Sequence, residues 1–255
     1  MFSVTNAKVA GFVPRWASFR GFTILFDNPG ESFTGAGPRR TLSTHPAIDF
    51  YAGLRDQLAR LDLDLLTNTY LFCPLPPPSY HVTVCDGGND GNIGRLPADK
   101  CDELHALLDG LPGSLSSPHE LTAAAARSPL VTEPWAIRFR YDRLVLWSHS
   151  ALVATLAPED DESAAQLHRL ERDRRDLSAH FQRHYNFGVS ERYVPHVTLG
   201  YFANREGAQL AMPILGAWEL AFCAGMVGKI LTFSRASLYG FTDMATFVTL
   251  AASLG

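Results

Sequence analysis

Residues 80–84 read Tyr-His-Val-Thr-Val, and residues 195–199 read Pro-His-Val-Thr-Leu. One H-x-T-x pattern therefore occurs twice, at His81 and again at His196. In a β-strand, residues i and i+2 point to the same face of the sheet. Each His would project beside its own Thr, while the apolar residues between and after them face the core. With nine histidines in the chain, two such matches arise by chance roughly once in a hundred sequences of average composition.

The residues around the first motif predict an alternation of strands and helices. Apolar side chains recur at helical spacing in the segment that follows Ser43, where Ser43 or Thr44 can cap the helix and Pro46 suits its first turn. The expected elements are a strand at 21–26, this helix, an extended lead at 71–74, the motif strand at 80–84, a loop at 86–94, a helix at 97–109 and a strand at 120–126.

The second half predicts the same order of elements. Trp135, Ile137, Phe139 and Tyr141 alternate with other residues, which is typical of a half-buried strand. The expected elements that follow are sheet at 144–147 and 151–156, a long charged helix at 159–185, the motif strand at 193–199, a short helix at 207–215 and strands at 218–223, 230–239 and 245–250.

These two halves predict an α+β fold made of one domain, residues 1–255, with two pseudo-symmetric lobes. The N-terminal lobe is expected at about 20–130 and the C-terminal lobe at about 131–255. Each lobe would be an antiparallel sheet with flanking helices. The two motif strands would then face each other across a central cleft.

Composition excludes several classes of protein. With 255 residues, 46% of them apolar, the chain can bury a large core, and its formal charge of −4 argues against long duplex nucleic acid as a partner. No leader and no stretch of about 18 apolar residues is evident, so we expect no membrane span. Four scattered cysteines without a CxxC pair indicate reduced thiols in the cytoplasm. The sequence leaves the oligomeric state open.

The paired motifs suit proton transfer at a phosphate. The unperturbed pKa of His lies near neutrality, so one imidazole, His81 or His196, can accept a proton while the other donates one. The hydroxyls of Thr83 and Thr198 can donate hydrogen bonds to phosphate oxygens, where negative charge collects. The predicted site requires no metal and no cofactor, and which His is the acid stays open.

The two motifs resemble those of the 2H phosphoesterase superfamily, which carries two H-x-[ST]-x motifs in a bilobal α/β fold. LigT-like RNA 2′,3′-cyclic phosphodiesterases and oligoadenylate-cleaving enzymes are among its members. The resemblance spans about 21–250, although its specific part is the eight motif residues. It implies that His81 and His196 form the acid–base pair and that Thr83 and Thr198 hold phosphate. The implied function is hydrolysis of a nucleotide or short-RNA phosphodiester, either a 2′,3′-cyclic phosphate or a 2′-5′ or 3′-5′ linkage.

Three further residues are candidates for substrate binding. Tyr201 lies two residues after Leu199 and would point into the core, unless a β-bulge turns it toward the cleft, where it could stack on a base. Tyr80 precedes the first motif, and Arg138 lies on the polar side of the strand at 135–141. The competing interpretations are that Tyr80 only packs in the core and that Arg138 lies on a solvent-exposed strand face.

Two other patterns suggest metals, and neither is complete. His180 and His184 have i, i+4 spacing on the charged helix, but no carboxylate forms an HExxH motif with them, so a solvated helix face is favoured. The loop at 86–94 resembles a calcium loop in composition alone. Two alternative functions follow: a silent nucleotide-binding module of the same fold, and a metal-dependent phosphoesterase that uses His180 and His184.

Overall fold

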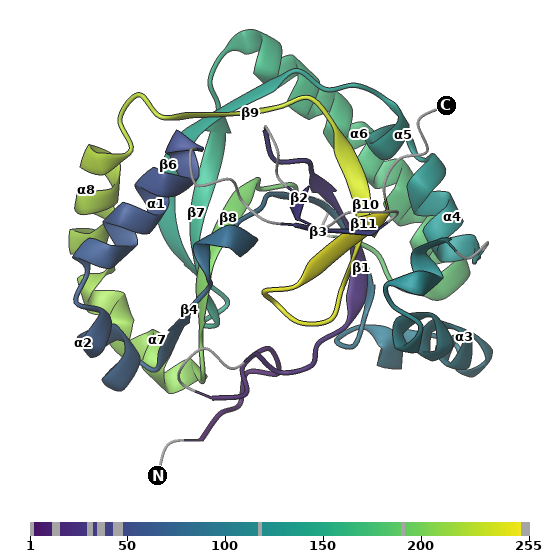
Figure 1. Ribbon diagram of the computed structural model, residues 1–255, viewed down its shortest axis with the longest axis horizontal. Helices are drawn as coiled ribbons and strands as arrows, with labels where there is room; N and C mark the ends of the chain where they lie inside the picture. The colour runs from purple at the N-terminus through teal and green to yellow at the C-terminus, as the bar shows by residue number, and fades with distance from the viewer. Residues whose placement is uncertain are drawn as a thin grey trace.

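Two antiparallel β-sheets form the framework of the computed structural model, which describes residues 3–11, 16–29, 33–34, 39–42, 48–116, 119–189 and 192–250 (Figure 1). The first sheet has the order β2 (Phe33–Thr34), β3 (Arg39–Leu42), β11 (Phe247–Leu250), β10 (Ala236–Phe241), β1 (Gly21–Phe26) and β5 (Thr83–Asn89). The second has the order β4 (Phe72–Pro74), β8 (His196–Phe202), β7 (Ala151–Pro158), β6 (Ile137–Trp147) and β9 (Ile230–Phe233).

Helices cover the outer side of each sheet, so the molecule has two lobes (Figure 1). Beside the first sheet lie α3 (Ala98–Asp109), α4 (Glu120–Arg127), α5 (Pro129–Thr132) and α6 (Asp161–Tyr185). Beside the second lie α1 (Asp49–Arg60), α2 (Leu63–Asn68), α7 (Arg205–Ala211) and α8 (Leu215–Gly225). Short 3₁₀ turns are η1 (Pro77–Ser79), η2 (Ile93–Arg95), η3 (Gly113–Ser116) and η4 (Met212–Ile214). The predicted α+β, bilobal architecture is confirmed.

The two lobes exchange segments of chain. Strand β4 and helix α1 come before the first motif but belong to the second sheet and its helical layer. Strands β10 and β11 come at the end of the chain but complete the first sheet. Helix α6 also crosses over, because its Phe181 packs edge-on against Phe22 of β1. A boundary near residue 130 therefore does not divide the strands between the lobes.

Two expected strands are helices. Residues 120–126 belong to α4, since a run of four alanines favours helix strongly. The ring of His119 caps this helix by accepting a hydrogen bond from the backbone N–H of Leu121 at 3.2 Å. Residues 218–223 belong to α8, where Trp218 and Phe222 lie one turn apart on the buried face. In both segments the prediction of a strand was wrong, because the few large apolar residues fit the two-residue period of a strand as well as the 3.6-residue period of a helix.

Other boundaries also differ from the prediction. The segment 230–239 divides into β9 and β10, which belong to different sheets. The expected loop at 86–94 is strand as far as Asn89 and then turns through η2. Helix α1 begins at Asp49, so the predicted caps Ser43 and Thr44 and the residue Pro46 lie outside the described residues.

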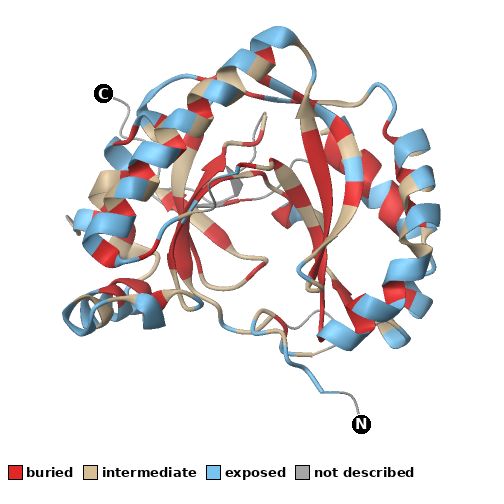
Figure 2. Cartoon of the chain, turned by 180° about the vertical axis from the view of Figure 1, so that it is seen from behind, coloured by how far each residue is buried: buried red, intermediate tan, exposed pale blue. Residues whose placement is uncertain are grey.

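The core follows the expected alternation along the strands (Figure 2). Strand β6 buries Ile137, Phe139 and Tyr141 and exposes Arg138 and Arg140. Figure 2 shows buried residues along both sheets and exposed residues on the outward sides of the helices. Because the helices cover the outer face of each sheet, the two inner faces can enclose a site between them.

One stretch is long and apolar enough to cross a membrane, contrary to expectation. It runs over Arg205–Gly225. In the structure, η4 interrupts it between α7 and α8, and Glu219 accepts hydrogen bonds from the Tyr141 hydroxyl and the Leu144 N–H. Because α8 packs on β6 in this way, the stretch forms part of the second lobe.

The N-terminal segment joins the two lobes. The backbone N–H groups of Thr5 and Asn6 donate to the carbonyl of Ala203, directly after β8. Farther along, the N–H of Phe19 donates to the carbonyl of Thr242, directly after β10. Lys8 lies between these two anchors and is thereby held at the opening between the sheets.

Candidate active site

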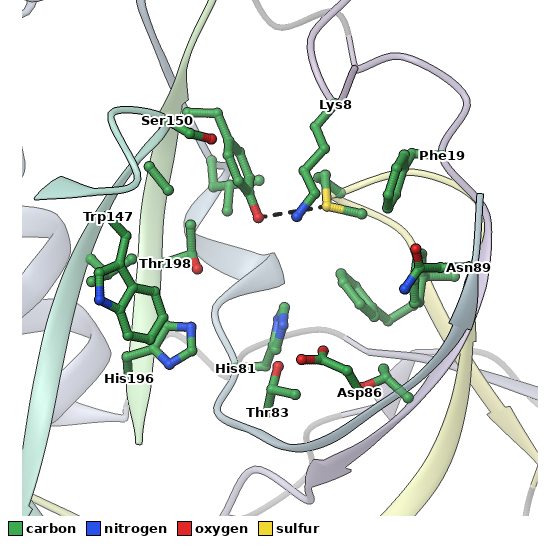
Figure 3. A pocket seen from close by; sticks show the side chains of 18 of the residues that line it. Lys8, Phe19, His81, Thr83, Asp86, Asn89, Trp147, Ser150, His196 and Thr198 are labelled. Carbon is green, nitrogen blue, oxygen red and sulfur yellow. Dashed lines mark hydrogen bonds between the residues drawn. The ribbon is translucent and has the colours of Figure 1, made fainter. Parts of the chain in front are cut away.

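Both H-x-T-x motifs line one pocket of about 310 Å³ between the two sheets (Figure 3). His81 and Thr83 come from the β5 side, and His196 and Thr198 come from β8. The apolar motif residues Val82, Val84, Val197 and Leu199 are fully buried on the other side of their strands. The geometry that the motifs predict, with both imidazoles at one cleft, is therefore present.

The two histidines are held in the same way. Nδ1 of His81 is 2.7 Å from the carbonyl oxygen of Ser79, and Nδ1 of His196 is 2.9 Å from that of Val194. A carbonyl oxygen can only accept, so each Nδ1 must carry the hydrogen. In the neutral ring Nε2 is then the basic nitrogen, and it is left for a ligand. The rigid, proline-containing leads at 76–79 and 194–195 place these carbonyls two residues before each His.

Each imidazole also packs against an aromatic ring. His81 lies 4.4 Å from Phe247 and His196 lies 4.2 Å from Trp147, measured between ring centroids. Burial, together with a smaller contribution from nearby His196, lowers the pKa of His81 to about 4. Burial also lowers the pKa of His196. Without a ligand, both rings are therefore neutral at pH 7.

Asp86 makes the two histidines electrostatically different. Its carboxylate lines the pocket and raises the pKa of His196, which offsets part of the effect of burial. For both rings the largest influence that raises the pKa is the Nδ1 hydrogen bond, to the carbonyl of Ser79 for His81 and to that of Val194 for His196, and Asp86 acts on His196 in addition. The negative charge of Asp86 thus favours the protonated form of His196, while His81 stays neutral over the wider pH range.

A β-bulge follows the Thr of each motif. Val84 is the extra residue of β5, because Thr83 pairs with Leu25 and Cys85 pairs with Ile24. Leu199 is the equivalent extra residue of β8, since Thr198 and Gly200 pair with adjacent residues of β7. A bulge shifts the alternation by one residue. The next side chain to reach the pocket is therefore the third after each Thr, Asp86 on β5 and Tyr201 on β8.

Tyr201 consequently lines the pocket, where its ring is largely buried, and this is the bulged outcome that the sequence left open. Its hydroxyl donates to the sulfur of Met244 at 3.6 Å, and Trp16 packs edge-on against its ring. The pairing with β4 requires glycine at position 200, because a Cβ there would lie 2.4 Å from the carbonyl oxygen of Cys73 on β4. Gly200 thereby lets β4 approach β8 closely.

Residues of the β8 lead and of α6 hold the first motif in place. The hydroxyl of Tyr193 donates to the carbonyl of Thr83 at 2.8 Å. The buried guanidinium of Arg174 donates to the carbonyl of Val84, the bulged residue, and stacks 4.4 Å from the centre of the Tyr193 ring. The orientation of Thr83 therefore depends on both halves of the chain.

Lys8 is the one Lys or Arg among the described residues that line the pocket. Its ammonium lies 4.9 Å from the Tyr201 ring centre and 5.3 Å from that of Phe19 (Figure 3). Aromatic faces attract a cation at these distances. The two rings thus hold a positive charge at the pocket.

The structure does not bring two of the predicted substrate-binding residues to this pocket. Tyr80 is buried beneath the first motif, where its carbonyl accepts from Asn28 and its ring packs edge-on against Tyr51. Arg138 is exposed on β6 and pairs with Asp160 at 3.1 Å. Sequence reasoning missed Lys8, Asp86, Phe247 and Trp147, for which no local pattern gives a signal.

Comparisons with known proteins show the fold of this chain. No family model and no curated protein matches its sequence. A solved protein of unknown function from Agrobacterium tumefaciens, ATU0111, is similar over 94% of this chain and 88% of its own, with 15% identity and a TM-score of 0.55. Escherichia coli LigT complexed with 3′-AMP covers 92% of this chain and 96% of its own at 15% identity, but its TM-score of 0.38 is too low to support an inference. ATU0111 therefore shares the overall fold with this chain.

Proposed function

We propose that this protein is a metal-independent phosphodiesterase that hydrolyses a nucleotide or short-RNA phosphodiester by His/His acid–base catalysis. One observation carries the proposal. Two imidazoles, each with Nδ1 bound to the carbonyl two residues earlier, line the same pocket and leave Nε2 for a ligand. A phosphate between them meets a proton acceptor, a proton donor and two Thr hydroxyls, which is the set that displacement at phosphorus needs.

The proposed step begins with a water molecule beside the phosphorus. Nε2 of neutral His81 removes a proton as the water oxygen bonds to phosphorus. The bond from phosphorus to the leaving ribose oxygen breaks, and Nε2–H of His196 protonates that oxygen. The phosphodiester becomes a phosphomonoester, and the proton on His81 returns to solvent while His196 takes one up. Thr83 and Thr198 donate to the non-bridging oxygens throughout.

The size of the pocket favours a mononucleotide unit. A volume of about 310 Å³ lies at the lower end of small-molecule sites. Tyr201 and Phe19 offer aromatic faces, although Lys8 occupies one side of each. A 2′,3′-cyclic nucleotide or a single RNA end therefore suits the site better than a duplex does.

The direct test is turnover of a substrate panel in EDTA. The panel contains 2′,3′-cyclic mononucleotides, RNA with a cyclic phosphate end, 2′-5′ oligoadenylate and cyclic dinucleotides. We expect one class to be hydrolysed with the chelator present. Binding without turnover would favour the silent nucleotide-binding module, and loss of turnover that Zn²⁺ or Mn²⁺ restores would favour a metal-dependent enzyme.

The pH dependence of kcat/KM should be a bell centred on the acidic side of 6.5. His81 must be neutral to act as base, so activity falls as the pH drops through its pKa of about 4. His196 must be protonated to act as acid, so activity falls as the pH rises through its pKa, which burial places below 6.5. Steady-state rates between pH 3.5 and 8 would measure both limbs.

Asp86→Asn tests which His is the acid. This change removes the charge that raises the pKa of His196. The alkaline limb should therefore move to lower pH while the acidic limb stays in place. Because Asp86 is exposed, the fold should be unaffected. If the acidic limb of the pH profile moves instead, the roles are reversed, with His81 as the acid and His196 as the base.

Lys8→Met should weaken substrate binding. The variant keeps the apolar stem between Phe19 and Tyr201 but loses the charge. A hydrogen bond to a charged group contributes about 1.5 to 3 kcal/mol, so we expect KM to rise roughly 10- to 100-fold. The effect on kcat should be smaller if Lys8 holds substrate and transition state equally. Lys229→Met, which removes an ion pair with Asp49 on the second lobe, is the control and should leave KM unchanged.

A further inference from the structure

A second group of ligand-type side chains lies where α4 meets α6. Glu120 is the first residue of α4, and His180 and His184 lie one turn apart near the end of α6. Each residue offers one ligand atom, and these three atoms all lie within 4.8 Å of one another. The His180 and His184 rings are 4.5 Å apart between centroids. The carboxylate that the sequence pattern lacked thus comes from 60 residues earlier in the chain.

The nitrogen and oxygen ligands of this group suit a transition metal of intermediate softness such as Zn²⁺. Two imidazoles and one carboxylate form a recurrent Zn²⁺ ligand set, in which the fourth position is taken by water. Ligand atoms around tetrahedral zinc lie about 3.3 Å apart, given bonds of about 2.0 to 2.1 Å. Small side-chain rotations would close the present spacing, because the helix already places His180 and His184 on one face.

The surroundings of the group support binding. The hydroxyl of Tyr185 donates to Oε2 of Glu120 at 3.2 Å, which orients the carboxylate as an outer-shell partner does in metal sites. Nε2 of His180 is buried without a hydrogen-bond partner among the described residues.

We propose that Glu120, His180 and His184 bind one Zn²⁺ ion that ties α4 to α6. None of the three lines the pocket of the motif histidines. The ion would therefore stabilise the helical layer on the first sheet and take no part in turnover. Hard cations such as Mg²⁺ prefer oxygen ligands and should not bind.

The test uses the full-length protein stripped with EDTA and dialysed against metal-free buffer. Calorimetric titration with ZnCl₂ should give one site per chain. The Tm should rise by roughly 5 to 10 °C at a free Zn²⁺ concentration 100 times Kd, and MgCl₂ should produce no shift. Absence of the Zn²⁺ shift would overturn the proposal.

Variants locate the ion. His184 is exposed, so His184→Ala should leave the fold intact and weaken Zn²⁺ binding at least about 100-fold. His168→Ala is the matched control, because His168 lies exposed on the same helix. Its Nδ1 lies 3.7 Å from the Glu171 carboxylate, and no third metal-binding side chain of the described residues joins this pair. The His168→Ala variant should bind Zn²⁺ with the same affinity as the unchanged protein. Full binding in His184→Ala that disappears in His81→Ala would place the ion in the motif pocket and refute this site.

Discussion

Replacement of His81 or His196 by Ala is expected to lower kcat/KM by about 10² to 10⁴, the usual cost of losing general acid–base help. In the proposed mechanism the two imidazoles act on one phosphorus, so the double variant should be little worse than the more damaged single variant. Initial rates on the cyclic nucleotide that is turned over best, near the optimum of the pH profile, would measure the loss.

Two controls separate chemistry from folding. His105→Ala changes an exposed residue of α3 and should leave the rate unchanged. Thermal melting should show that the motif variants remain folded, since both imidazoles are only half-buried. Early melting of both motif variants, with activity that scales with the folded fraction, would make H-x-T-x a packing pattern in this protein.

Thr83→Val and Thr198→Val should each lower kcat by about 10 to 10³, the range for loss of one donor to a developing negative charge. Valine keeps the β-branched shape and removes the hydroxyl alone. The effect should fall on kcat more than on KM, because the phosphate oxygens gain charge in the transition state.

The matched control is Thr232→Val, an exposed Thr on β9 of the second sheet. It should leave both kinetic constants unchanged, which excludes a general effect of valine on these sheets. Equal losses in kcat for Thr232→Val and the motif variants would mean that the hydroxyls of Thr83 and Thr198 do not act on the phosphate.

The motif strands could be predicted because their signal is local. Alternation predicts that His81 and Thr83 share one face and that Val82 and Val84 are buried, and this holds although β5 begins only at Thr83, two residues after His81. The order of segments likewise indicated two sheets with helices outside them. Both inferences need no more than a period of two along the strand and a period of 3.6 along the helix.

The rest of the site depends on contacts between distant residues. Asp86 reaches the pocket because β5 bulges at Val84 where it pairs with β1, and no property of residues 83–86 alone specifies that bulge. Lys8 arrives on a segment without periodicity, positioned by its neighbours' bonds to Ala203. Helix α4 shows a different limit of prediction from sequence. Its four consecutive alanines are all small, so their spacing does not distinguish a half-buried strand from a helix.

Strand exchange between the lobes has a consequence for biosynthesis. On the ribosome, β1 emerges early, but Gly21 pairs with Phe241, about 220 positions later. At about 5 to 20 residues per second, translation leaves the apolar segment GFTILF without its β10 partner for roughly 10 to 45 s. Even after β5 has paired with one edge of β1, the other edge stays unpaired and prone to aggregation until synthesis is almost complete.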